Sequence, residues 1–247
     1  SSQMRINALA RASCAFAFTC LIASQVAQAQ SWTATDLGAS TATGLNASGQ
    51  VVGYYTTAGG DRHAFATGAN GIGFVDLGTL GGAESLASAV NNAGQIVGWS
   101  TNAAGTSVAF ATTIDAGGLT SLGTLTGTQS YARAINNNGE VLINYSGTSA
   151  SGTAVMSLST AEVRDVTPYG YSGHYYLPQS ASANSINDLG TIVGSKVESC
   201  NCTANAYVFS SSDGLYFSVG SGVMDSSAYA VNNQNQVAGY LNTVIPG

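Results

Sequence analysis

The sequence offers few side chains of the types that catalyse reactions. Its two histidines are His63 and His174, and the short motifs of a hydrolase nucleophile, a zinc-binding helix or a phosphate-binding loop are missing. Paired carboxylates for glycoside hydrolysis remain, with Glu84, Asp165 and Asp225 as candidates. Because these carboxylates do not recur along the chain, we predict a protein without catalytic activity or cofactor, and keep a glycosidase as the alternative.

Cys200 and Cys202 are separated by one residue in the fourth of five repeats described below. In an oxidising compartment, two thiols form a disulfide by default, and we predict this bond. A Cys-x-Cys bridge closes a small, strained ring that is readily reduced, so free or intermolecular thiols are an alternative. A metal site is a third alternative, although no further Cys or His is close in sequence, and we predict none.

Aromatic side chains gather in one stretch, residues 168–178, which lengthens the fourth repeat. It includes Tyr171, His174, Tyr175 and Tyr176. Tyrosine presents a flat apolar face with a hydroxyl group, which suits stacking on a sugar or anchoring a protein partner. We predict a binding loop here, the alternative being a loop that packs its aromatic rings on its own sheet.

The N-terminal residues 1–29 have the features of a secretory signal peptide. Arg5 and Arg11 precede an apolar stretch, residues 12–23, and Ala27-Gln28-Ala29 follows as the cleavage site. The apolar stretch is short for a membrane span. We therefore predict a secreted, extracellular bacterial protein whose mature chain begins at Gln30 and has no membrane span.

Charge excludes one large class of partners. The whole chain has a net charge of −6, and loss of Arg5 and Arg11 would leave four basic against twelve acidic residues, a net of −8. Nucleic acids and anionic membranes both require clustered Lys and Arg. We expect neither as a partner.

An internal repeat organises the rest of the chain. Five segments share an apolar residue, an Asn, two variable residues and then Gly, with Asn235 in place of that Gly in the fifth segment. The marker asparagines, spaced by 45, 45, 51 and 45 residues, are Asn46, Asn91, Asn136, Asn187 and Asn232. Asn-x-x-Gly between apolar runs predicts a hairpin whose Asn bonds to the backbone two residues on and whose Gly has a positive φ. These asparagines are therefore structural in the first place.

Each repeat predicts four short strands, which is the size of one propeller blade. We predict an all-β five-bladed β-propeller, residues 30–247, with units near 39–82, 83–127, 128–170, 171–222 and 223–247. The residue before each marker Asn is apolar and expected in the core. The fifth unit has two strands, and residues 32–38, which resemble a fourth strand, would complete it. Alternatives are a β-solenoid or a fragment of a larger propeller.

In each unit, one variable position lies between two positions at which small residues recur. It lies three residues before the marker Asn, on the strand expected to line a central channel. Its occupants are Thr43, Ser88, Arg133, Asn184 and Tyr229. We predict that they form a ligand-binding ring near the channel mouth, the alternative being a solvated channel lining.

The repeats resemble a known family of bacterial extracellular proteins. His63-Ala64-Phe65, the run from Val75 to Gly82 and the Asn-x-x-Gly-Gln units are similar to HAF repeats over nearly all of residues 32–247. The third and fourth units depart from the His-Ala-Phe and Leu-Gly-Thr-Leu patterns. The resemblance implies a secreted or surface protein and transfers no catalytic residue.

Three functions follow as hypotheses. The first is a secreted module that binds an extracellular glycan or a surface protein through loops and the variable ring. The second is a structural protein of the extracellular matrix that self-associates by strand pairing at the incomplete fifth unit, because an unpaired sheet edge invites another chain. The third is the glycosidase with channel carboxylates.

Overall fold

The fold is built from β-strands. The computed structural model describes residues 35–148, 151–167, 181–197, 204–210, 214–219 and 225–242, and the only helix within them is the short 3₁₀ turn η1 (Ala69–Gly71). The predicted signal peptide, the tyrosine-rich loop and both mature cysteines lie outside the described residues. The all-β prediction is confirmed.

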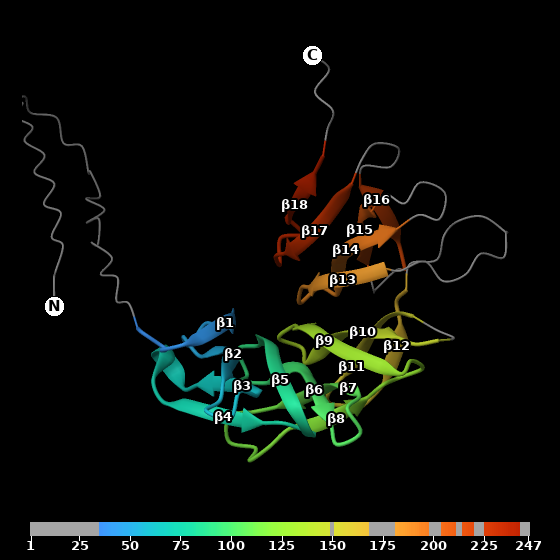
Figure 1. Ribbon diagram of the computed structural model, residues 1–247. Helices are drawn as coiled ribbons and strands as arrows, with labels where there is room; N and C mark the ends of the chain where they lie inside the picture. Colours follow the sequence, from blue (N-terminus) through green and yellow to red (C-terminus); the bar gives the residue numbers. More distant parts are fainter. Residues whose placement is uncertain are drawn as a thin grey trace, which may run out of the picture. The chain divides into compact units, whose positions relative to one another are not determined.

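The strands follow one another as antiparallel meanders, coloured blue to red along the chain in Figure 1. The first unit contains β1 (Ser40–Leu45), β2 (Val51–Thr56), β3 (Arg62–Thr67) and β4 (Phe74–Gly78). The second contains β5 (Gly81–Val90), β6 (Ile96–Asn102), β7 (Ser107–Thr112) and β8 (Thr120–Gly123). A parallel pairing of Arg62 with Glu84 joins these two meanders into one eight-stranded sheet.

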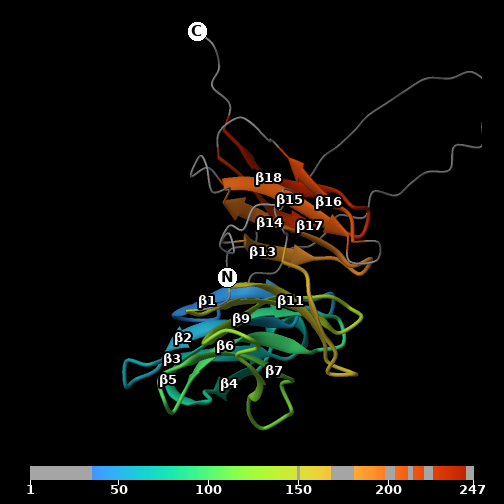
Figure 2. The ribbon, with the colours of Figure 1, turned by 90° about the vertical axis from the view of Figure 1, so that its right-hand side faces the viewer.

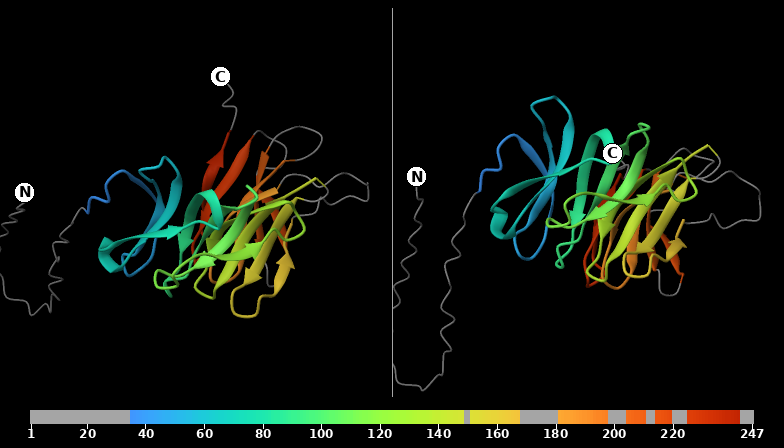
Figure 3. Two further views of the ribbon diagram at one scale, coloured as in Figure 1. Left: turned by 60° about the horizontal axis from the view of Figure 1, so that its bottom comes forward. Right: turned by 90° about the horizontal axis from the view of Figure 1, so that it is seen from below.

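The remaining units are separate sheets. The third contains β9 (Gln129–Ile135), β10 (Glu140–Ser146), β11 (Gly152–Ser157) and β12 (Val163–Asp165). The fourth contains β13 (Ala181–Ile186), β14 (Thr191–Val197), β15 (Ala204–Ser210) and β16 (Tyr216–Val219). The fifth contains β17 (Ser226–Val231) and β18 (Val237–Leu241). Figures 2 and 3 show these sheets from three further directions.

The marker asparagine shapes the hairpin between the first two strands of every unit, as predicted. In the first unit, the side-chain oxygen of Asn46 accepts the N–H of Ser48 at 3.1 Å and that of Gln50 at 3.0 Å. Gly49 follows with a φ of 76°, which a residue with a Cβ adopts only under strain. In the fifth unit, Asn235 takes this position with a φ of 58°, as expected of the residue that best replaces Gly there.

A β-bulge interrupts the first strand of every unit. In the second unit, Ala87 pairs with Gly98 and Ala89 pairs with Val97, so Ser88 is left unpaired between them. The bulge brings the backbone so close to the second strand that a Cβ on Gly98 would collide with the carbonyl oxygen of Leu86. Gly53, Gly194 and Gly239 face the same restriction in their own units, which explains the Gly of the second strand there. The third unit has Ile143 at this position beside the same bulge.

The core is divided among the interfaces between successive units. Val52, Ala64 and Ala66 of the first unit pack against Ile96 and Phe110 of the second, and three further clusters repeat this arrangement along the chain. Burial of one Val, Ile or Phe side chain contributes about 1.5–3 kcal/mol. A unit therefore depends on its neighbours for most of its apolar burial, as in other repeat folds.

One prediction for the first unit was wrong, and one for the fifth unit stays a prediction. Residues 35–38, which were expected to help close the fifth unit, form no strand, and Asp36 accepts the N–H of Gly38 at 2.8 Å in a local turn. Residues 32–34 lie outside the described residues. Leu45, expected in the core, is 68% exposed, whereas its counterparts Val90 and Ile186 are buried against the preceding unit.

The close approach at the bulge makes a specific prediction about Gly98. Gly98→Ala should lower the free energy of unfolding by about 1–3 kcal/mol, because the added methyl group must displace backbone. Chemical denaturation measures the change. Gly59→Ala is the matched control, since a Cβ on Gly59 would meet only the Thr57 hydroxyl at 3.7 Å. Equal stability of the two variants would contradict the bulge geometry.

Candidate functional site

The five hairpin turns surround a single cavity of about 350 Å³. Every unit contributes the apolar residue before the marker Asn, the Asn itself and the residue after it. The lining residues are Leu45, Asn46, Ala47, Val90, Asn91, Asn92, Ile135, Asn136, Asn137, Ile186, Asn187, Asp188, Val231, Asn232 and Asn233. The cavity is therefore lined by the five apolar residues before the marker asparagines, by the side-chain amides of the asparagines and by one charged side chain, that of Asp188.

The marker asparagines form a ladder of hydrogen bonds from unit to unit. The side-chain nitrogen of Asn46 donates to the carbonyl oxygen of Asn91 at 3.0 Å, and Asn91 donates in the same way to Asn136 at 3.0 Å. The ladder continues from Asn136 to Asn187 at 3.0 Å and from Asn187 to Asn232 at 2.8 Å. One carboxamide thus closes its own turn through its oxygen and fixes the next unit through its nitrogen.

A second ladder runs beside the first, one residue further along each turn. The backbone N–H of Asn92 donates to the side-chain oxygen of Asn137 at 2.9 Å, and that of Asp188 donates to Asn233 at 2.9 Å. Asp188 accepts the side-chain N–H of Asn137 at 2.9 Å and its backbone N–H at 2.8 Å. These bonds, together with one from Asn233, hold the pKa of Asp188 below its usual value.

Two substitutions in the repeat compensate for each other across one interface. In the first and second units, Gln50 and Gln95 lie beside the turn glycines Gly94 and Gly139 of the following unit. The fourth unit has the shorter Thr191 at this position. The side-chain oxygen of Asn235, in the following unit, accepts hydrogen bonds from the Thr191 hydroxyl and from the side-chain nitrogen of Asn187, each at 2.8 Å.

The structure places all five residues of the predicted ring at the β-bulges. Each is the unpaired residue of its first strand, and each is two residues before the first cavity-lining residue of its unit. The structure brings no two of these five described side chains into hydrogen-bond or ring contact. The five residues are Thr43, Ser88, Arg133, Asn184 and Tyr229.

These five side chains differ in what they contact. The Thr43 hydroxyl donates to the carbonyl oxygen of Ala87, and the Asn184 amide donates to that of Ala228 at 2.8 Å, so both link neighbouring units. Arg133 and Tyr229 are exposed, Tyr229 by 58%. An intermediate position is held by Ser88, which is partly buried. Thr43 and Asn184 therefore bond to a neighbouring unit, although Thr43 is exposed like Arg133 and Tyr229.

Aromatic rings adjoin Arg133 and Tyr229. The guanidinium carbon of Arg133 lies 5.8 Å from the ring centre of Tyr131, and Tyr131 meets Trp99 of the preceding unit edge to face at 5.7 Å. The rings of Tyr229 and Tyr240 are 5.8 Å apart. Our sequence reasoning missed this set, although an aromatic residue eight positions after the marker Asn recurs at Tyr54, Trp99 and Tyr240 and could have indicated it.

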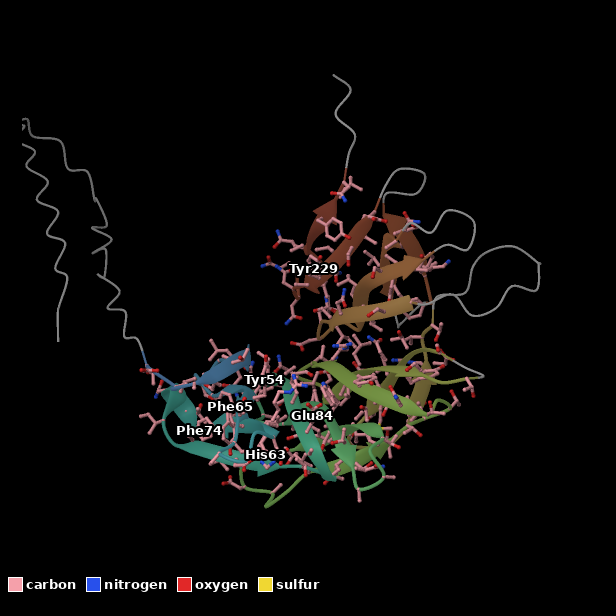
Figure 4. The ribbon with its side chains drawn as sticks, viewed as in Figure 1. Tyr54, His63, Phe65, Phe74, Glu84 and Tyr229 are labelled. Atoms are coloured by element: carbon pink, nitrogen blue, oxygen red, sulfur yellow. The ribbon has the colours of Figure 1, made fainter. Side chains whose placement is uncertain are left out.

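A polar pair and an aromatic stack lie on the first unit (Figure 4). The ring nitrogen Nδ1 of His63 is 2.9 Å from a carboxylate oxygen of Asp76, and Phe74 stacks on the buried Phe65 at 4.7 Å. Burial raises the pKa of Asp76, but the N–H of Gly78 and the side chains of His63 and Tyr55 outweigh burial and lower it. His63 is thus paired with a carboxylate of its own unit.

The three carboxylates of the glycosidase alternative have separate local partners. Glu84 pairs with Arg62 at 2.7 Å, Asp165 accepts the N–H of Thr167 at 2.8 Å, and Asp225 accepts the N–H of Ala204 at 3.0 Å. The structure shows no hydrogen bond or ion pair that joins any two of these three described residues.

The described part of the chain contains no cluster of three or more His, Cys, Asp or Glu side chains placed to hold a metal ion. Within the same residues, no helix has the length and apolar character needed to cross a membrane.

Comparison with known proteins identifies the fold. TolB from Acinetobacter baumannii matches with a TM-score of 0.55 and 13% sequence identity over 76% of this chain. The chain has a β-propeller fold. The match covers 44% of the TolB chain, so this propeller spans less than half of that protein's length. A nidogen/laminin complex matches with a TM-score of 0.49 and 10% identity, over 79% of this chain and 69% of that one.

Sequence comparisons add no family. No family model matches the propeller sequence, and no curated protein matches it.

The Asn ladder predicts a difference between an internal turn and the last one. Asn91→Asp keeps the oxygen that closes the turn but removes the donor to Asn136, whereas Asn232→Asp removes only a bond to Gln236. At neutral pH, Asn91→Asp should destabilise the propeller by about 1–3 kcal/mol more than Asn232→Asp, because a buried carbonyl loses its donor. Urea denaturation measures both. Equal losses would show that the ladder contributes no stability.

The Thr191 and Asn235 pair predicts strong coupling. Thr191→Gln should crowd Asn235, and Asn235→Gly should remove two acceptor contacts, while the double variant restores the arrangement of the first two units. The coupling free energy from a double-mutant cycle should reach about 1 kcal/mol or more. A control cycle combines Thr191→Gln with Asn70→Gly, a left-handed Asn of the first unit. Additive effects in both cycles would contradict the compensation.

Proposed function

We propose that this propeller is a non-catalytic module of a secreted, HAF-type bacterial protein, and that it binds an extracellular glycan. The observation that carries the proposal is the bulge at the same position of all five first strands, occupied by a different side chain in every unit. A bulge redirects a side chain out of the regular pleat and is frequent beside binding sites. The constant scaffold thus presents one variable side chain per repeat.

The surroundings of Arg133 favour a carbohydrate ligand. Trp99 and Tyr131 provide aromatic faces, and Arg133 provides several hydrogen-bond donors beside them. The Tyr131 hydroxyl donates to Gln129 at 2.7 Å, which fixes the ring. Flat apolar surface with adjacent donors matches the alternating C–H faces and hydroxyl edges of a sugar. The exposed ring of Tyr229 offers a further aromatic face.

Glycan-array screening followed by calorimetry tests this function. The parent protein should retain at least one glycan, and Arg133→Ala or Tyr131→Ala should weaken its binding by about tenfold or more, which corresponds to about 1.4 kcal/mol. Arg164→Ala is the matched control, because this half-exposed arginine lies on the outer strand β12 of the same unit. A parent protein that retains no glycan, or equal binding by all variants, would count against the proposal.

A further inference from the structure

One face of the fifth unit is not covered by any residue in the described part of the chain. In the second unit, Val97 and Trp99 lie on the face that packs against the third unit. Ala238 and Tyr240 hold the corresponding positions of the fifth unit, 141 residues later, and both are exposed, Tyr240 by 40%. The fifth unit therefore presents the same face that the second unit buries.

Hydrogen-bond donors remain at the edge of this face. The side-chain nitrogen of Asn232 bonds only within its own turn, to Gln236 at 2.7 Å, whereas the other four marker asparagines also donate to the next unit. The backbone N–H of Asn233 has no acceptor in the described part of the chain, while its four counterparts donate to a side chain of the next unit. Both ladders therefore end in donors at the fifth unit.

The first unit lacks the features that would receive these donors. The acceptors of the second ladder are Asn or Asp side chains, but the first unit has Ala47 at this position. The turn glycines of the second and third units lie beside Gln50 and Gln95, each from the preceding unit. In the first unit, Asn70 of the same unit fills the equivalent space beside Gly49. The first unit thus has the character of a capping repeat. Its surface does not complement the uncovered face of the fifth unit, either within one molecule or between two copies.

We propose that the uncovered face of the fifth unit is an interface for a further hairpin repeat of the same class, placed in series after it. The partner has an apolar residue, then Asn, then Asn or Asp, at its turn. The side-chain oxygen of the residue after the partner's marker Asn accepts the backbone N–H of Asn233. The backbone carbonyl of that marker Asn accepts the side-chain N–H of Asn232, and the partner's apolar side chains cover Ala238 and Tyr240. The interface continues the four that already join units one to five.

An extended chain tests this interface. A copy of residues 107–146 is joined directly after Gly247, which corresponds in register to Thr106, so that a hairpin with the Asn136-Asn137 turn follows the fifth unit. Hydrogen exchange at the Asn233 backbone N–H is then measured in the parent and the extended chain. Exchange should slow by about tenfold or more in the extended chain, because the N–H gains an acceptor. The thermal midpoint should rise as well.

A matched control isolates the proposed hydrogen bond. The same extension carrying Asn137→Ala in the appended copy keeps the hairpin but lacks the acceptor, so the Asn233 N–H should exchange as fast as in the parent. The Asp188 N–H, which donates to Asn233 in every version, reports that the rest of the fold is intact. If the first extension does not fold, a copy of residues 62–101 provides a second one in the same register, with the Asn91-Asn92 turn.

Three outcomes would overturn the proposal. Unchanged exchange at Asn233 in a folded extended chain would show that the face is not such an interface. Slow exchange in the dilute parent would show that the first unit already covers the face. Protection that appears in the parent only at high concentration, together with dimers in light scattering, would assign the face to a second copy. None of these results depends on whether the propeller binds a glycan.

Discussion

The carboxamide of the marker asparagine is the interaction on which the propeller depends. Its oxygen accepts two backbone N–H groups and closes the turn, and its nitrogen reaches the backbone of the next unit. A side chain with only acceptors or only donors could not make both sets of bonds. Because one residue carries both tasks, the geometry of a single hairpin and the spacing between two sheets are fixed together.

This arrangement explains why the chain can vary so much elsewhere. The marker Asn and the residue after it fix the turn and the spacing between units. The residue at the bulge has no pairing partner in its own sheet, so its side chain is free to vary. Thr43 and Asn184 use that freedom to link neighbouring units, whereas Arg133 and Tyr229 remain exposed beside aromatic rings. The recognition surface that we propose is therefore built by the scaffold itself, with one side chain from each repeat.

The division of the core into interfaces makes the two ends of the array different from its middle. Units two to four have both faces covered, while the first has an exposed Leu45 and the fifth an exposed Tyr240. Their chemistry differs, since Asn70 fills the space beside the turn of the first unit, whereas the backbone N–H of Asn233 in the fifth unit has no acceptor among the described residues. Repeat proteins generally need capping units, because an uncovered internal face is apolar, and of these two units the first has that character.

The sequence by itself determined what is local. The Asn-x-x-Gly spacing predicted the hairpins, and the tolerance of Asn for a positive φ predicted the conformation of Asn235. The recurring strands and the repeat length predicted the propeller class. These features could be predicted because a turn depends on residues that are close in sequence, such as Asn46 and Gln50.

Only the tertiary structure decided what depends on two units at once. The ladder bonds join residues 45 or 51 positions apart, and the compensation between Thr191 and Asn235 spans 44. The exposure of Leu45 reflects which neighbour covers a face, and the sequence of one unit does not contain that information. Local spacing fixes a turn, whereas contacts between sheets are set by the packing of whole units.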